Sequence, residues 1–246
     1  MTSNQPPLWR RAAAELLGTS LLVMIVVGSG MTAQQLSPSD VGLQLLQNSA
    51  ATVLGLTVLI LVLGPVSGAH FNPVVSLADW ILGRRRGTGL PLPELGTYIA
   101  AQTVGAVSGS VVANAMFEVG TSISTKERAT SGHLLGEVVA TAGLILLIFA
   151  LAATSRGVLA APAVGAYIGA AYWFTSSSSF ANPAVTVGRI FTDTFAGIAP
   201  ASVPGFVVAQ LIGAAAGLGL LLILFPSADR AADDAVLAHS SETVSS

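Results

Sequence analysis

Six long apolar stretches, separated by short polar segments, dominate this 246-residue chain. Each is close to the ~20 residues that a helix needs to cross the hydrocarbon core of a bilayer. The pattern predicts an all-α membrane protein with six transmembrane helices. The predicted spans are approximately residues 12–30, 46–64, 97–117, 134–153, 158–176 and 203–225.

Composition supports the membrane assignment. Hydrophobic residues make up 52% of the chain and charged residues 9%, with a mean hydropathy of +0.75, so charges are too few to cover a soluble surface. The net charge of -2 gives no reason to expect a nucleic-acid partner. Because the chain has no cysteine, disulfides, thiolate metal sites and thiol chemistry are excluded.

An Asn-Pro pair occurs twice in short apolar segments, at Asn72-Pro73-Val74 and at Asn182-Pro183-Ala184. Each pair begins a stretch of about ten residues, which is too short to cross the bilayer as a helix. Asn is a favourable N-cap, and Pro at the first helical position loses no useful donor. The pairs therefore predict two half-helices, over residues 72–82 and 182–192.

Two other motifs also recur in the same order, which indicates a duplicated chain. Three spans per half is an odd number, so the second half must enter the membrane from the opposite face and the repeat is inverted. We expect one domain over residues 1–226, with repeats at about 11–117 and 133–226, and a disordered cytoplasmic tail over 227–246. The recurring motifs are Glu15-x-x-x-Thr19 with Glu137-x-x-x-Thr141, and Ala101-Gln102-x-x-Gly105-Ala106 with Ala209-Gln210-x-x-Gly213-Ala214.

Basic residues are unevenly distributed between the two sides of the predicted topology. By the positive-inside rule, the richer side is cytoplasmic. This places both termini in the cytoplasm and predicts a multi-pass protein of the cell's inner (plasma) membrane. The richer side carries Arg10, Arg11, Arg84, Arg85, Arg86, Arg156 and Arg230; the other side carries Lys126, Arg128 and Arg189.

Half-helices that enter from opposite faces meet N-terminus to N-terminus near the membrane midplane. There they present the side-chain amides of Asn72 and Asn182 together with two positive helix ends. Irregular backbone at that depth requires a wet cavity. About half a unit charge per helix end, at ~5 Å and an effective dielectric constant of ~20, opposes a cation by roughly 3 kcal/mol in total. Such a pore should admit neutral hydrogen-bonding molecules and oppose protons and cations.

These residues resemble the signature of the major intrinsic proteins, the aquaporins and aquaglyceroporins, over about residues 11–226. The resemblance rests on Ser67-Gly68-Ala69-His70-Phe71-Asn72-Pro73-Val74, on Phe180-Ala181-Asn182-Pro183-Ala184 and on the paired motifs. It implies an aquaporin-like fold of six transmembrane helices plus two half-helices. It also implies a right-handed bundle, one pore per chain and assembly as a homotetramer.

The chain departs from this family at one position. Most members have an Arg three residues after the second Asn, in a narrow outer selectivity filter, but here that residue is Val185. Arg189 lies a helical turn further on and is an imperfect substitute. Spacing from the motifs places the other three filter positions at Thr52, Ala170 and Ser179. Leu54 is the alternative to Thr52, and the position at Ala170 is uncertain by one residue. This ring of small or aliphatic residues predicts a wider and more neutral lumen.

The chain is also similar to a bacterial branch of the family associated with arsenic resistance. That similarity rests on residues 48–52, 64–70 and 171–174, and the branch likewise lacks the filter Arg. It implies small neutral solutes, namely metalloid hydroxides such as arsenite, methylated arsenicals or glycerol-like polyols. A pore used mainly by water remains the alternative.

Glu15 and Glu137 are carboxyl groups inside apolar spans. Proton coupling would make the chain a secondary transporter, but their symmetric positions favour a structural role that holds the half-membrane loops. His70 should border the cytoplasmic pore mouth, with hydrogen bonding favoured over a pH-dependent constriction. No phosphate loop, nucleophile with a base, carboxylate cluster or metal-ligand group is visible, so we expect neither catalysis nor a cofactor. The prediction is a passive channel whose partners are small neutral solutes and the bilayer.

Overall fold

The computed structural model describes residues 6–84 and 88–226, and all the regular secondary structure within these residues is helical. Six of its helical segments are long and apolar enough to cross a membrane, as the sequence predicted. Arg85, Arg86, Arg230 and the predicted tail over 227–246 lie outside the described residues. The long helices are α1 (Leu8–Leu36), α2 (Val41–Ser67), α4 (Leu92–Met116), α5 (Ser131–Ala153), α6 (Ala160–Phe174, extended at its start by the 3-10 turn η1, Gly157–Leu159) and α8 (Val203–Leu224, preceded by η3, Pro200–Ser202).

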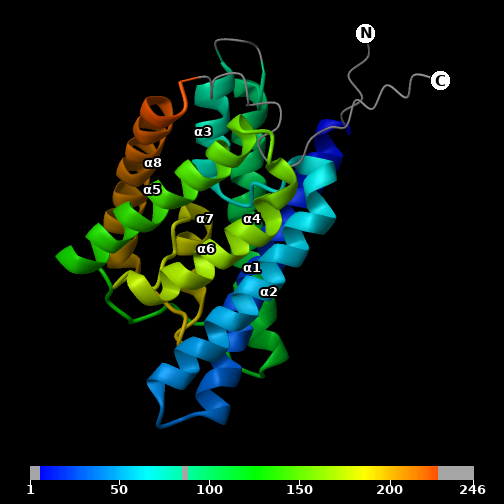
Figure 1. Ribbon diagram of the computed structural model, residues 1–246. Helices are drawn as coiled ribbons and strands as arrows, with labels where there is room; N and C mark the ends of the chain where they lie inside the picture. Colours follow the sequence, from blue (N-terminus) through cyan, green and yellow to red (C-terminus); the bar gives the residue numbers. More distant parts are fainter. Residues whose placement is uncertain (1–5, 85–87, 227–246) are drawn as a thin grey trace.

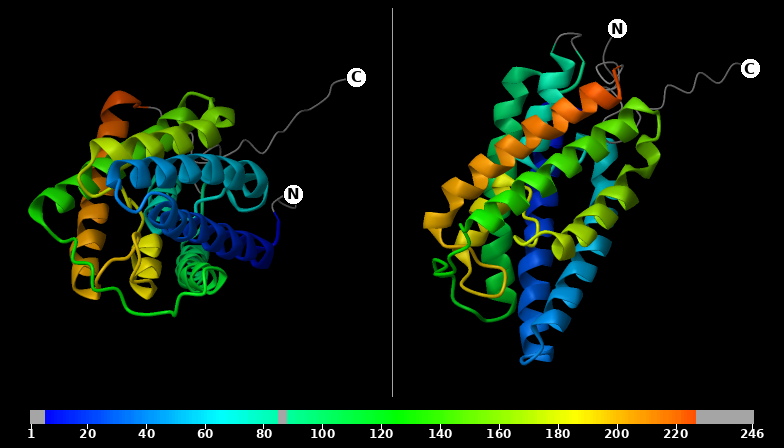
Figure 2. Two further views of the ribbon diagram at one scale, coloured as in Figure 1. Left: turned by 90° about the horizontal axis from the view of Figure 1, so that it is seen from below. Right: turned by 60° about the vertical axis from the view of Figure 1, so that its left-hand side comes forward.

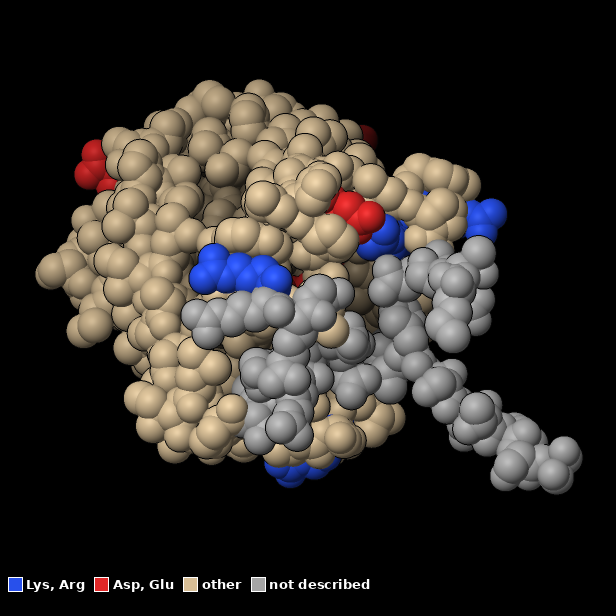
Figure 3. Space-filling model, turned by 90° about the horizontal axis from the view of Figure 1, so that it is seen from above, with Lys and Arg blue, Asp and Glu red and all other residues tan. Residues whose placement is uncertain are grey.

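The helices form two equivalent sets, as the inverted repeat requires. In the first set α1 packs on α2 and α4, and in the second α5 packs on α6 and α8. Figures 1 and 2 show the two sets side by side around a common centre. The first turn of α1 and the last turn of α8 lie at the same end of the bundle (Figure 1). Figure 3 views that end and shows scattered basic and acidic side chains.

Glycines allow the close approach of two helix pairs, α1 with α4 and α5 with α8. On α4, a Cβ at Gly105 or Gly109 would collide with backbone carbonyls of α1, and on α8 the equivalent Gly213 and Gly217 face carbonyls of α5. Only glycine allows backbones to approach so closely, which is the packing that membrane helices use in place of a hydrophobic driving force. The repeated Gly motifs are therefore helix-packing surfaces.

The two Asn-Pro pairs begin the short helices α3 (Pro73–Gly83) and α7 (Pro183–Gly188). The 3-10 turn η2 (Arg189–Phe191) continues α7, so the second half-helix covers nearly the predicted length in two helical forms. The Asn72 side chain accepts from the amide of Val74, and the Asn182 side chain accepts from the amide of Ala184. The two helices enter the bundle from opposite ends and contact each other inside it (Figure 1).

Candidate pore

A cavity runs between the long helices and the two half-membrane loops. Each long helix beside it contributes residues spaced by four, which is one face of an α-helix. These faces are almost entirely aliphatic, whereas the loops that lead into α3 and α7 supply the polar lining. The helical residues are Leu22 and Val26 on α1, Thr52, Leu56 and Ile60 on α2, Leu144 and Ile148 on α5, and Ala160, Val164, Ile168 and Tyr172 on α6.

Asn72 and Asn182 both line the cavity, and each binds the half-membrane loop that carries the other. Asn72 Nδ2 donates to the carbonyl of Ala181 at 2.8 Å, and Asn182 Nδ2 donates to the carbonyl of Phe71 at 2.7 Å. Because each Oδ1 caps its own half-helix, only donor hydrogens of the two amides remain for the lumen. One hydrogen of each NH2 group thus binds the opposite half-membrane loop, and the other is left for the lumen.

Glu15 holds the first half-membrane loop from α1. Its carboxylate accepts from the amides of His70 and Phe71, at 3.0 and 2.7 Å, and from Gln102 Nε2 at 2.7 Å. Ser67 Oγ also donates to it, at 2.6 Å. A carboxylate with four donors is satisfied without solvent, which accounts for its complete burial.

Glu137 makes the equivalent contacts in the second half. It accepts from the amides of Phe180 and Ala181, at 2.9 and 2.8 Å, and from Gln210 Nε2 at 2.6 Å. The amides that these two carboxylates bind belong to loops with unusual backbone, since Phe71 and Ala181 have φ of +48° and +47°. Non-glycine residues in this region cost about 1 kcal/mol or more each, so the loops depend on such contacts.

Three of the four predicted filter residues line the outer part of the cavity: Thr52, Ser179 and Val185. The prediction for Ala170 is wrong, because this residue is exposed on the outer face of α6 and does not line the cavity. Tyr172 lines it instead, one turn beyond Ile168 on the same face of the helix. Leu54, the rival of Thr52, is 69% exposed and faces away from the cavity.

Two larger side chains change the predicted character of this region. Tyr172 places an aromatic ring in the lining, with its hydroxyl 3.2 Å from Thr52 Oγ1. Arg189 also lines the cavity, although it is only 4% exposed, and its guanidinium carbon lies 3.5 Å from the centre of the Phe180 ring. The lumen is therefore neither ringed only by small residues nor free of charge there. The spacing of four residues from Val164 to Tyr172 was the signal that could have identified the tyrosine.

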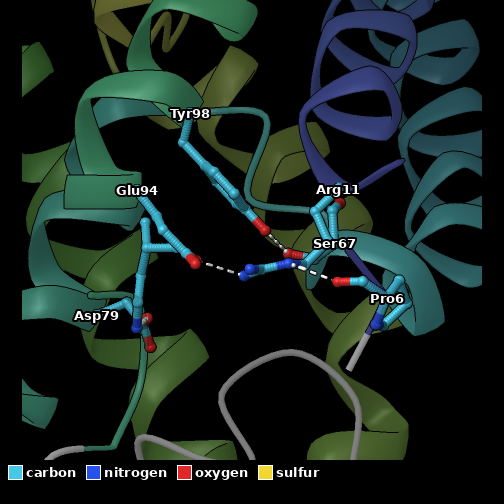
Figure 4. Close-up of polar contacts among 7 residues, drawn as sticks. Pro6, Arg11, Ser67, Asp79, Glu94 and Tyr98 are labelled. Carbon is cyan, nitrogen blue, oxygen red and sulfur yellow. Dashed lines mark hydrogen bonds and ion pairs between the residues drawn. The ribbon is translucent and has the colours of Figure 1, made fainter. Parts of the chain in front are cut away.

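His70 lines the other end of the cavity, where its Nδ1 lies 3.0 Å from Ser76 Oγ and its ring packs 5.5 Å from Tyr98. Figure 4 shows the contacts around Tyr98, which donates to the Ser67 carbonyl at 2.9 Å. In the same view Arg11 of α1 reaches Glu94 of α4, at 2.6 Å. These contacts fix the first half-membrane loop against the ends of α1 and α4.

Comparison with known proteins identifies this architecture. A family model described as "Major intrinsic protein" matches residues 2–180. The aquaglyceroporin AqpS of Rhizobium meliloti (strain 1021) is 47% identical over 216 residues, which are 87% of this chain and 89% of that protein. The chain belongs to the major intrinsic protein family. As a major intrinsic protein it is a passive channel for small solutes and not an enzyme.

Two further matches have lower sequence identity. Aquaporin-2 of Rattus norvegicus is 31% identical over 242 residues, covering 89% of this major intrinsic protein and 80% of the rat protein. Among solved structures, the aquaglyceroporin from Plasmodium falciparum superposes with a TM-score of 0.65. That match has 21% identity and covers 92% of this chain and 100% of the other, so it establishes the shared fold.

Proposed function

We propose that this major intrinsic protein conducts small uncharged polyhydroxylated solutes, with metalloid hydroxides such as arsenite as its principal cargo and glycerol-like polyols and water as further permeants. The observation that carries the proposal is Val185, an uncharged side chain that lines the cavity directly beside the second Asn-Pro pair. With Thr52 and Ser179 it leaves the lumen less obstructed than a filter with Arg at this position. Similarity to an aquaglyceroporin at 47% identity supports a pore wider than a strict water channel.

The two walls of the cavity suit such solutes. Aliphatic side chains of the long helices cover one wall, and the amides of Asn72 and Asn182 donate from the other. A molecule with hydroxyls on one face and little polarity on the other can keep its hydrogen bonds while its apolar part lies against the aliphatic wall. Arsenite is largely uncharged at neutral pH and glycerol is neutral, so neither meets the electrostatic barrier at the midplane.

A proton-coupled transporter is the competing function. Its carboxylate candidates at the fully buried centre of the described bundle, Glu15 and Glu137, each accept at least three hydrogen bonds that hold the loops. Loss of either charge would weaken the pore itself, so neither is suited to a cycle of protonation. Purified protein in liposomes distinguishes the functions: a channel conducts arsenite and glycerol down their gradients at a rate that an imposed proton gradient does not change.

We further propose that the protein is a homotetramer in the plasma (inner) membrane with cytoplasmic termini. The side of the bundle where α1 begins carries Arg10, Arg11, Arg84 and Arg156, which supports that orientation by the positive-inside rule. Light scattering coupled to size-exclusion chromatography tests the tetramer. Protease protection of terminal tags in sealed vesicles tests the orientation.

A further inference from the structure

Three consecutive carbonyls in the outer loop after η2 are bound by two arginines. Arg189 Nε donates to the carbonyl of Ala196, while Arg128 donates from Nε to Gly197 at 2.7 Å and from Nη2 to Phe195 at 3.0 Å. Arg189 belongs to η2 and Arg128 to the loop between α4 and α5, and their side chains bind the three carbonyls alternately. This arrangement fixes the Arg189 guanidinium from its Nε side.

The aromatic ring of Phe180 packs against the guanidinium of Arg189. The guanidinium carbon of Arg189 lies 3.5 Å from the ring centre, and that of Arg128 lies 5.5 Å from it. A guanidinium over an aromatic face is a favourable cation–π contact. Among residues 6–84 and 88–226, neither arginine forms a salt bridge, so both positive charges are held by neutral groups. The buried carboxylate of Glu137 is engaged by its own donors.

Polar atoms beside the lumen near Arg189 have no hydrogen-bond partner among the described residues. Nε is the guanidinium nitrogen with a hydrogen bond to a described residue, which leaves the two Nη groups available at a side chain that lines the cavity. Ser179 lines the cavity too, and its Oγ is buried without a partner in the described chain. The hydroxyl of Tyr172 is engaged by Thr52. Unpaired buried polar groups are costly, so these donors require a solute or water in the lumen.

We propose that Arg189 is the specificity-determining cation of the outer pore: from one helical turn beyond Val185, its Nη groups donate to the oxygens of a passing solute and its charge excludes cations. The inference rests on the proposed function and deepens it, because it names the group that recognises the solute at the outer end. Because Arg189 stands one turn beyond the usual position of the filter Arg, the space beside Val185 stays open. The guanidinium charge of Arg189 still lies at the lumen. The pore is thereby wider at the level of Val185 and still selective at the level of Arg189.

The expected size of the effect follows from simple electrostatics. A unit charge ~5 Å from a monovalent cation, at an effective dielectric constant of ~20, lowers cation occupancy on the order of 100-fold. Because the midplane amides remain as a second barrier, we expect removal of the Arg189 charge to raise cation entry by only about tenfold. The loss of one hydrogen bond to a solute should slow that solute by about fivefold.

The test compares Arg189→Gln with Arg189→Lys in liposomes, because both replacements can still donate to the Ala196 carbonyl but only lysine keeps the charge. The probes are methylammonium as a cation, and glycerol and water as neutral permeants. Lys126→Gln is the matched control, since Lys126 is an exposed cation of the loop that carries Arg128 and does not line the cavity. Size-exclusion chromatography and circular dichroism verify the fold of each variant.

We expect Arg189→Gln to admit methylammonium about tenfold faster than wild type, and Arg189→Lys and Lys126→Gln to exclude it as wild type does. Equal methylammonium entry in Arg189→Gln and wild type overturns the proposal. If Arg189→Gln does not fold, Arg189→Lys still tests the proposal. Its single ammonium replaces the two Nη groups that donate to the solute, so the ratio of glycerol to water permeability should fall. An unchanged ratio contradicts the assignment. Failure of wild type to conduct glycerol or arsenite would instead contradict the proposed function.

Discussion

Asn72 and Asn182 each form a hydrogen bond to the half-membrane loop that carries the other. The side-chain amide of each donates to the backbone carbonyl of the residue that precedes the other Asn, at 2.8 and 2.7 Å. Each side-chain oxygen is meanwhile engaged by its own half-helix. The pair is therefore fixed in position and offers the lumen donors only. A cation that passes this point finds no acceptor from either amide to replace its hydration.

Replacing either Asn by Asp should open the pore to cations. Aspartate keeps the capping oxygen but adds a negative charge, which at ~5 Å and an effective dielectric constant of ~20 favours a cation on the order of 100-fold. Potassium flux into liposomes measures the change. Asn114→Asp is the control, because Asn114 is buried on α4 outside the cavity lining. An equal leak in the control would assign the effect to a damaged fold.

Val185→Arg should restrict solutes by size. The new side chain would enter the lumen directly beside Asn182, one turn before Arg189, where Val185 now leaves space. We expect glycerol permeability to fall about tenfold, equivalent to ~1.4 kcal/mol in the barrier, and water permeability to fall less. Stopped-flow light scattering gives both rates on one preparation. An equal loss of both would show that Val185 does not set the width.

Most of the fold could be predicted from the sequence because its causes are local. The six apolar runs, the Asn-Pro caps and the recurring Glu and Gly motifs each determine a helix, a loop or a contact by short-range chemistry. The orientation of α6 could not be predicted with the same accuracy, since the length of the loop before Asn182 decides which face meets the lumen. An error of two residues on a helix rotates a side chain by ~200°, which is why Tyr172 and not Ala170 lines the cavity.

The role of Arg189 in the lining was also not predictable from spacing alone. Ideal helical geometry places it a turn beyond Val185, but its direction depends on the Ala196 carbonyl and the Phe180 ring, which come from other segments. The change from α7 to the 3-10 turn η2 begins at Arg189 itself. Local pattern therefore identified the residue, and tertiary contacts determined its position.

Two glycines of α4 should respond in opposite directions to the same substitution. A Cβ at Gly105 would collide with the Leu16 carbonyl on α1, whereas Gly96 has open space around it. We expect Gly105→Ala to destabilise the protein by about 1–3 kcal/mol through overpacking, and Gly96→Ala to stabilise it by ~0.5–1 kcal/mol through helix propensity. Thermal unfolding in detergent measures both. A neutral Gly105→Ala would contradict the close approach of α1 and α4.

Asp193 should make the outer loops sensitive to acid. The amide of Thr125 donates to its carboxylate at 3.0 Å and, with the Thr125 and Ser124 hydroxyls, lowers the pKa of Asp193 below its ordinary value of 3.8. A lowered folded-state pKa means that the stabilisation is present above the ordinary value and is lost as the pH falls through the folded-state value.

The melting temperature of Asp193→Asn should accordingly lie below that of wild type at pH 7, and the difference should shrink as the pH is lowered past the ordinary aspartate pKa. Differential scanning fluorimetry from pH 7 to about pH 3 measures it. Glu127→Gln, at an exposed carboxylate of the loop that carries Thr125, is the control. A difference between wild type and Asp193→Asn that does not depend on pH would exclude the carboxylate as its source.

The most direct test of the central claim is stopped-flow light scattering on the purified protein in liposomes, with water, glycerol and arsenite compared in the presence and absence of a proton gradient. A passive channel for small uncharged solutes predicts rapid arsenite and glycerol flux at rates that the gradient leaves unchanged. Flux of water alone, or solute flux that requires the gradient, would contradict it.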